Sequence, residues 1–208
     1  MRPTTSGVYR AFESPRDRGD EWLLVDGEGD PTYVAASGYG DSLAATVAGL
    51  RPGYRVAATI EWQDDEARFA DLAVESPTLF AFVDGTPDIF EAARETFRAG
   101  VRENVGVNSR VTRDTDGDPN GVLYTFAEQS GARDVFAEMR DGRTPLEPLV
   151  EKAIEGGRDP PFEVFVLRPA GDGDPFVVVY LAFEKGGLLA DTVRDEYGCP
   201  RPDEPLVG

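Results

Sequence analysis

The sequence contains no histidine, one cysteine and two lysines among its 208 residues. Without histidine, neither a Ser-His nor a Cys-His nucleophile pair can form, and imidazole cannot serve as a metal ligand. The single thiol, Cys199, excludes a disulfide within the chain and a zinc site built from several thiolates. We expect it to be an incidental surface thiol. These absences favour binding over catalysis, so we expect a protein that is not an enzyme.

Long apolar runs are also missing. The longest run, residues 176–183, has the length of a strand, whereas a membrane-spanning helix needs about 18 apolar residues. The opening segment MRPTTSG has no apolar signal region. We therefore expect a soluble, cytoplasmic protein with no membrane partner.

Acidic residues are abundant: 39 Asp and Glu face 21 Lys and Arg, for a net charge of −18. They are spread from Glu13 to Glu204 without a block, which indicates adaptation to the solvent rather than an interaction tail. In molar salt the Debye length is about 3 Å, so the self-repulsion of this coat is screened. We interpret the charge as adaptation to a salt-rich cytoplasm; the alternative is an acidic surface for a basic partner. Neither interpretation excludes nucleic-acid binding.

Short strand-like runs bounded by turn residues fill the first 80 residues. Strands are expected near residues 8–12, 22–25, 32–36, 54–62 and 67–74, with a short helix over residues 41–48. Three strands, a helix and two strands is the order of an OB-fold barrel. We therefore predict an α+β protein in which residues 1–80 form a small five-stranded OB-like β-barrel.

An OB-like barrel binds ligands on its second and third strands and two flanking loops. In this chain that surface would carry Arg16, Arg18, Trp22 and Tyr33. Aromatic rings that stack bases beside arginines suit single-stranded nucleic acid. The alternative is that Trp22 and Tyr33 pack in the core or rim while the arginines pair with neighbouring acids. The acidic loop at residues 63–66 also argues against a basic groove there.

Residues 86–198 are expected to form an α+β domain, followed by a tail over residues 199–208. Two runs of helix, hairpin and helix are predicted. The first has apolar residues at helical spacing from Phe90 to Val101, then a hairpin over residues 107–127. The second opens on a capping box at Thr144–Glu147. A shift of 56 residues aligns these two runs, which is the pattern that an internal duplication leaves. Together they predict a four-stranded antiparallel sheet with helices on one side.

The two hairpins differ in polarity. The second is almost entirely apolar and is expected to be central, whereas the first carries polar residues: Asn108, Arg110, Arg113 and Asn120. A polar hairpin beside a buried one is either an exposed edge or a surface for a partner.

The acidic turn Asp114, Asp116 and Asp118 resembles the start of a calcium loop. Pro119 and Thr125, however, stand where an EF-hand requires glycine and glutamate. We therefore expect no bound metal and no cofactor. No phosphate-binding, dinucleotide-binding or serine-hydrolase motif occurs. The alternative function is a metal-dependent hydrolase using this carboxylate cluster.

Residues 108–128 (NSRVTRDTDGDPNGVLYTFAE) and 161–169 (PFEVFVLRP), together with the acidic coat, resemble an uncharacterised protein family of haloarchaea. The resemblance implies salt adaptation and brings no activity or site residues. We therefore predict a non-enzymatic binding or adaptor module, whose partner is a protein or a single-stranded nucleic acid.

Overall fold

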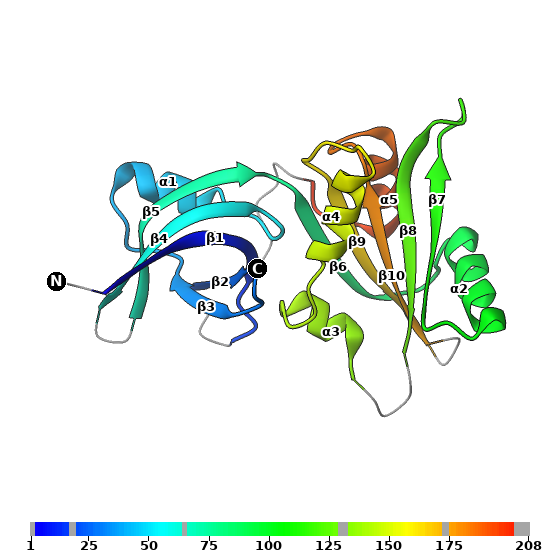
Figure 1. Cartoon of the computed structure of the whole chain (residues 1–208), viewed down its shortest axis with the longest axis horizontal. Helices are drawn as coiled ribbons and strands as arrows, with labels where there is room; N and C mark the ends of the chain where they lie inside the picture. Colours follow the sequence, from blue (N-terminus) through cyan, green and yellow to red (C-terminus); the bar gives the residue numbers. More distant parts are fainter. Residues whose placement is uncertain (1–2, 17–19, 64–65, 129–132, 172–174, 202–208) are drawn as a thin grey trace. The chain divides into compact units, whose positions relative to one another are not determined.

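The computed structural model describes residues 3–16, 20–63, 66–128, 133–171 and 175–201. The chain folds as two compact units (Figure 1). The N-terminal unit comprises Met1–Thr78 with Met139–Pro145, and the C-terminal unit comprises Leu79–Glu138 with Leu146–Gly208. Across the described residues there are ten strands and five helices, and no helix among them is long and apolar enough to cross a membrane.

The N-terminal unit is built from its strands and one helix in the predicted order. They are β1 (Thr4–Glu13), β2 (Glu21–Asp26), β3 (Pro31–Ala35), α1 (Asp41–Ala48), β4 (Arg55–Gln63) and β5 (Glu66–Ser76). The strands pair in the order β1-β2-β3-β5-β4, and β1 also pairs with β4, so the sheet closes on itself. The β3–β5 contact is parallel at Val34 and Ala67, and the other pairs are antiparallel.

The interior of this closed sheet holds the apolar residues that alternate along its strands. Leu24, Val34, Ile60 and Phe69 are all buried there, and α1 contributes Val47. Alternation with a period of two places every second side chain inside, so the intervening residues form the outer surface.

The C-terminal unit is a mixed sheet covered by helices. Its elements are β6 (Leu79–Thr86), α2 (Glu91–Glu103), β7 (Val107–Arg113), β8 (Pro119–Ala127), α3 (Val135–Arg140), α4 (Glu147–Glu155), β9 (Glu163–Pro169), β10 (Phe176–Ala182) and α5 (Leu188–Tyr197). The predicted succession of helix, hairpin and helix occurs twice, as α2-β7-β8-α3 and α4-β9-β10-α5.

The prediction of a four-stranded antiparallel sheet was wrong. Within the described residues the sheet has five strands in the order β6-β9-β10-β8-β7, and β6 runs parallel to β9. Leu79 of β6 lies opposite Glu163 of β9, 84 residues later in the chain. A parallel pair of this kind needs a long crossover connection, so no local hairpin pattern in the sequence predicts it.

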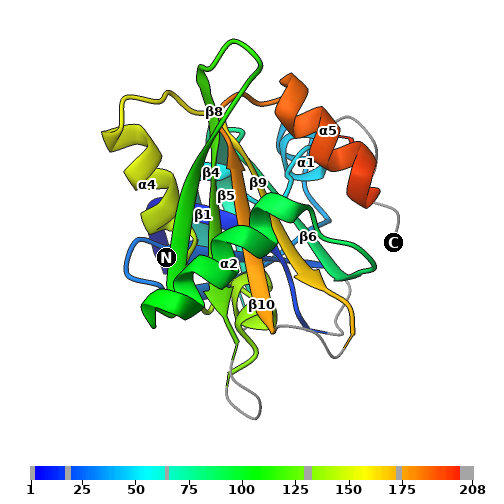
Figure 2. The same ribbon diagram turned by 90° about the vertical axis from the view of Figure 1, so that its right-hand side faces the viewer.

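Helices lie on both faces of this sheet, not on one (Figures 1 and 2). On one face Phe97 of α2 and Val193 of α5 pack with Phe165 and Tyr180 of the sheet. On the other face Phe136 of α3 packs edge-to-face against Phe82 of β6, with ring centroids 6.3 Å apart. Two covered faces explain why the central strands β9 and β10 are apolar throughout.

Candidate functional site

A pocket of about 780 Å³ opens on the outer surface of the N-terminal unit. Its walls come from the β1–β2 loop, β2, β3, the end of β4 and the start of β5. The residues used below are Arg16, Glu21, Tyr33, Trp62 and Arg68. We call this the β2–β3 pocket.

Arg16 and Tyr33 form a stacked pair in the β2–β3 pocket. The guanidinium carbon of Arg16 lies 3.3 Å from the centroid of the Tyr33 ring. Within the described part of the chain, no carboxylate is paired with Arg16. The planar cation therefore stacks on the aromatic face, an interaction that guanidinium groups make well, and keeps its positive charge.

Arg68 acts differently, because its donors are used within the unit. Its Nη2 donates to the carbonyls of Ser37 (3.0 Å) and Gly38 (2.8 Å), and its Nη1 lies 3.4 Å from Glu66 Oε2. The guanidinium also lies 4.8 Å from the centroid of the Tyr39 ring. Arg68 thus fixes the segment after β3 against β5 and forms a wall of the pocket.

Tyr39 completes this wall behind Arg68. Its hydroxyl donates to the carbonyl of Ala35 (2.5 Å) and accepts from the N–H of Phe69 (3.2 Å). Burial raises the pKa of the Tyr39 hydroxyl, against the lowering effect of the Phe69 N–H. The phenol therefore remains a neutral donor at physiological pH.

Two further features distinguish the pocket from an ordinary surface hollow. Trp62, at the end of β4, keeps 38% of its surface exposed. Glu21 Oε2 is buried and has no hydrogen-bond partner among the described residues. An unpaired buried carboxylate oxygen is costly, so this atom is an acceptor that a ligand N–H could satisfy.

The structure brings together only part of the predicted nucleic-acid surface. Arg16 and Tyr33 meet in the β2–β3 pocket, whereas Trp22 packs against the core of the closed sheet. Arg18 lies outside the described residues. Trp62 and Arg68 line the pocket without having been predicted. The signal was their position beside the loop that joins the fourth and fifth strands, a loop that contacts ligands in OB folds.

The predicted partner residues of the β7–β8 hairpin make their contacts within the C-terminal unit. Asn108 donates to the Thr96 carbonyl of α2 (2.9 Å), and Arg110 donates to Glu95 of α2 (2.8 Å). The other two serve the hairpin itself: Arg113 donates to the Gly117 carbonyl (2.8 Å), and Asn120 accepts from Thr112 (3.0 Å). β7 is the edge strand of the sheet.

The acidic turn between β7 and β8 uses its first carboxylate to shape the backbone. Asp114 Oδ1 accepts the N–H groups of Asp116 (3.0 Å) and Asp118 (2.9 Å). Gly117 supplies the positive φ of 89° that closes the turn. In the described part of the chain, no group of three or more Asp, Glu or Cys side chains is arranged to hold a metal ion.

Cys199 is buried, which corrects the expectation of a surface thiol. Its exposed fraction is 7%, and its backbone N–H donates to the Arg194 carbonyl at the end of α5. Nearby, Arg194 forms a buried ion pair with Glu163 of β9. Burial raises the pKa of the Cys199 thiol to about 11. A protonated, enclosed thiol is a poor nucleophile.

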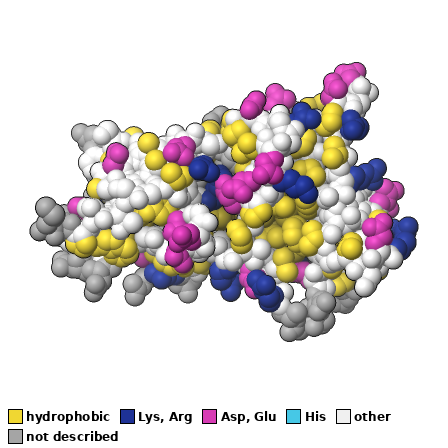
Figure 3. Space-filling view, viewed as in Figure 1, with side chains coloured by type: hydrophobic (Ala, Val, Ile, Leu, Met, Phe, Trp, Pro, Cys, Tyr) yellow, Lys and Arg dark blue, Asp and Glu magenta, His cyan; other side chains and the backbone are white. Residues whose placement is uncertain are grey.

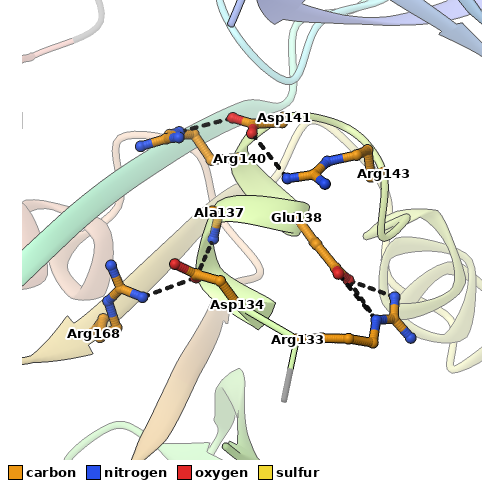
Figure 4. Close-up of polar contacts among 8 residues, drawn as sticks. All are labelled: Arg133, Asp134, Ala137, Glu138, Arg140, Asp141, Arg143 and Arg168. Carbon is orange, nitrogen blue, oxygen red and sulfur yellow. Dashed lines mark hydrogen bonds and ion pairs between the residues drawn. The ribbon is translucent and has the colours of Figure 1, made fainter. Parts of the chain in front are cut away.

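Arg168 organises a polar network in the C-terminal unit (Figure 4). It donates to both carboxylate oxygens of Asp84 (2.7 and 2.6 Å) and to Asp134 (2.8 Å). Asp134 Oδ1 also accepts the N–H of Ala137 in the first turn of α3. These bonds satisfy Arg168 and tie β9 to β6 and α3, which is a structural role.

Comparison with known proteins gives a family and no activity. No curated protein and no solved structure matches the chain. A family of unknown function, DUF6663, matches over residues 1–202. Since the match spans nearly the whole chain, the protein belongs to this family of unknown function.

Proposed function

We propose that the protein is a non-enzymatic binding module whose N-terminal unit holds single-stranded nucleic acid in the β2–β3 pocket. One observation carries the proposal: the Arg16–Tyr33 stack and the exposed Trp62 converge on the same pocket. Aromatic rings and guanidinium planes offer flat surfaces on which bases stack, and this binding tolerates any base sequence.

The strand order supports an OB-like assignment for this unit. Five strands paired as β1-β2-β3-β5-β4, with α1 between β3 and β4, is the arrangement of an OB fold. OB folds bind oligonucleotides on the second and third strands, flanked by the loops after the first and fourth strands. The β2–β3 pocket occupies this location, since Arg16 precedes β2 and Trp62 ends β4.

The charges of the pocket favour stacking over phosphate neutralisation. Among the described residues that line the pocket, Arg68 is engaged by carbonyls and Glu66, which leaves Arg16 as the cation available to a phosphate. Each phosphate neutralised on a single strand gives a slope of about −0.7 in the logarithm of affinity against the logarithm of salt concentration. We therefore expect a total slope near −0.7, and binding that persists in concentrated salt.

A salt-rich cytoplasm is the proposed setting. Acidic side chains lie at several separate places on the face shown in Figure 3 rather than in one patch. The net charge of −18 is carried by a chain with two lysines, a composition that suits screening by concentrated ions. The resemblance to haloarchaeal proteins supports the same setting.

Trp62 provides a direct reporter for the test. The Trp22→Phe variant leaves Trp62 as the one tryptophan, since the chain has two. In about 1 M KCl, titration with a single-stranded oligonucleotide is expected to quench its fluorescence to saturation. Stacking is worth about 1–3 kcal/mol per base, so Tyr33→Ala should weaken binding about 5- to 150-fold.

The matched control is a pair of arginine variants. Arg16→Ala removes the stacked cation, whereas Arg55→Ala removes an exposed arginine of β4 that pairs with Glu75 at 3.1 Å. Arg16→Ala should weaken binding and Arg55→Ala should leave it unchanged. No quenching, or equal losses in the two variants, would refute the proposal. Circular dichroism of each variant checks that it is folded.

A further inference from the structure

β7 presents an unpaired strand edge on the C-terminal unit. It is the last strand in the sheet order, beside β8, and no strand of the described chain pairs with its outer side (Figure 1). An exposed edge strand is a template for another strand, and proteins normally blunt it or cover it.

The hydrogen-bonding pattern of the hairpin shows which backbone groups face outward. The Ala127 N–H donates to the Gly106 carbonyl (2.9 Å), directly opposite in the register that pairs Val107 with Phe126. Bonded pairs alternate along an antiparallel ladder, so every second residue of β7 bonds to β8. The residues that instead direct their N–H and C=O groups to the outer edge are Val107, Ser109 and Val111. The Ser109 N–H donates to the Asn108 side-chain oxygen (2.9 Å), an exposed local bond that pairing with another strand would replace.

The side chains of β7 separate by the same alternation. Asn108 and Arg110 reach back to α2 on one face of the sheet. Val107 and Val111 lie on the opposite face and keep 52% and 51% of their surface exposed. Two exposed valines beside backbone N–H and C=O groups that point outward favour a β-sheet partner over solvent.

The acidic coat is interrupted at this strand. Residues 104–113 contain no Asp or Glu and two arginines, in a chain with a net charge of −18. Carboxylates brought into contact at an interface repel each other even where salt screens longer distances, and this segment offers a surface without them.

We propose that β7 pairs antiparallel with β7 of a second copy, across a twofold axis at Ser109. In this register Ser109 lies opposite itself, and Val107 of each copy lies opposite Val111 of the other. The outward N–H and C=O groups then meet in bonded pairs, and the two sheets continue into one. On the other face Arg110 lies opposite Asn108.

The neighbouring register is disfavoured by charge. Moving the twofold axis by one residue, to Arg110, would place the two Arg110 side chains directly opposite each other. Like charges opposite one another destabilise a strand pair. The register centred on Ser109 avoids this clash and places Val107 of each copy opposite Val111 of the other.

The measurement is the molar mass of the full chain by light scattering or sedimentation equilibrium, over a range of concentrations in about 1 M KCl. The mass should rise from the 22.6 kDa of the monomer toward twice that value. Ser109→Pro removes an outward N–H and leaves the β8 ladder intact, so it should give a monomer. Val74→Glu, at an exposed valine of β5, should dimerise like the wild type.

A charge pair tests the register itself. Val107→Glu and Val111→Lys, made singly, should each shift the dissociation constant upward by at least tenfold. The double variant places a carboxylate opposite an ammonium group at both ends of the pair and should recover the dimer. A monomer at every concentration, or a dimer that survives Ser109→Pro, overturns the proposal. A double variant as weak as the single variants overturns the register.

Discussion

Cys199 and the Glu163–Arg194 pair are buried ionisable groups of the C-terminal unit. The thiol lies against the end of α5, and the ion pair joins α5 to β9. Glu163 is fully enclosed: its Oε1 accepts the Gly186 N–H (2.8 Å) and its Oε2 accepts from Arg194. Both features sit in the C-terminal unit and act on its stability.

The thiol should react slowly in the folded protein. With a pKa of about 11 in place of 9.0, the thiolate fraction at pH 8 falls about 100-fold. A disulfide reagent at pH 8 should therefore modify native protein at least 100-fold more slowly than protein in guanidinium chloride. Equal rates in the two states would contradict the burial.

The same shift gives a stability change with a definite sign. Because the folded thiol keeps its proton above the pH at which the unfolded thiol loses it, the unfolded state is favoured as pH rises. The contribution is complete below pH 9.0 and is lost as pH rises toward about 11. Cys199→Ser, which lacks this titration, should show a smaller loss of stability over that interval.

Glu163→Gln should strongly destabilise the C-terminal unit. The substitution breaks the buried pair and leaves Arg194 with the more exposed Asp191, 3.5 Å away, as its remaining counter-charge among the described residues. Breaking a buried pair costs about 3–5 kcal/mol. Glu75→Gln is the control, because its partner Arg55 and Glu75 itself are both exposed and such pairs contribute about 0–1 kcal/mol. Chemical denaturation measures both. Similar losses in the two variants would contradict the buried character of the pair.

How much of the β2–β3 pocket could be predicted depended on whether apolar and polar side chains alternate along each strand. Arg16 and Tyr33 could be placed because turn residues mark the loop that carries Arg16 and the ends of the strand that carries Tyr33. In β2 the run from Trp22 to Val25 is continuously apolar, so no period of two shows which side Trp22 faces. Only closure of the sheet turns Trp22 toward the core and leaves Trp62 at the rim.

At the scale of helices and strands, the sequence predicted those elements that clear turn or capping residues bound on both sides. α1 has the bounds expected for it, and β7 and β8 span the expected hairpin over residues 107–127. α5 ends before Gly198, which adopts a φ of 63°. The helix expected from Phe90 begins at Glu91. The capping box expected at Thr144–Glu147 does not cap α4, which begins at Glu147 and has no side-chain cap. The strand β6 was missed because its apolar half runs into Asp84 and Gly85, which are typical of a hinge.

Asp134 is the residue on which the start of α3 depends. It accepts the Ala137 N–H and pairs with Arg168, and these contacts hold the pKa of its carboxyl below the ordinary range. Asp134→Ala should cost about 1–2 kcal/mol in the free energy of unfolding. Asp88→Ala, at an exposed acid 3.8 Å from Arg94, is the control and should cost little.

The pH dependence of this difference has the opposite sign to that of the thiol. A lowered pKa stabilises the fold above the unfolded value, about 4, and the contribution is lost as pH falls through the folded value. The difference in the free energy of unfolding between the wild type and Asp134→Ala should therefore become smaller in acid. A difference in the free energy of unfolding that stays constant down to pH 2 would show that the charge of the Asp134 carboxylate contributes nothing to stability.

For the whole molecule, the net charge of −18 makes stability depend on salt. Repulsion among the carboxylates favours the expanded chain, and ions screen it. The thermal midpoint followed by circular dichroism should rise from dilute buffer to about 1 M KCl. An unchanged midpoint would contradict the proposed adaptation to a salt-rich cytoplasm.

The most direct test of the proposed function is to map where a single strand lies on the full chain. Photocrosslinking with a single-stranded RNA containing 5-iodouridine joins stacked bases to aromatic side chains, and mass spectrometry locates the joined residue. Performed in about 1 M KCl, it should place the crosslinks on Tyr33 or Trp62, and Tyr33→Ala should reduce them. Crosslinks confined to the C-terminal unit would contradict the account. A crosslink yield no higher than that of a matched duplex would also contradict it.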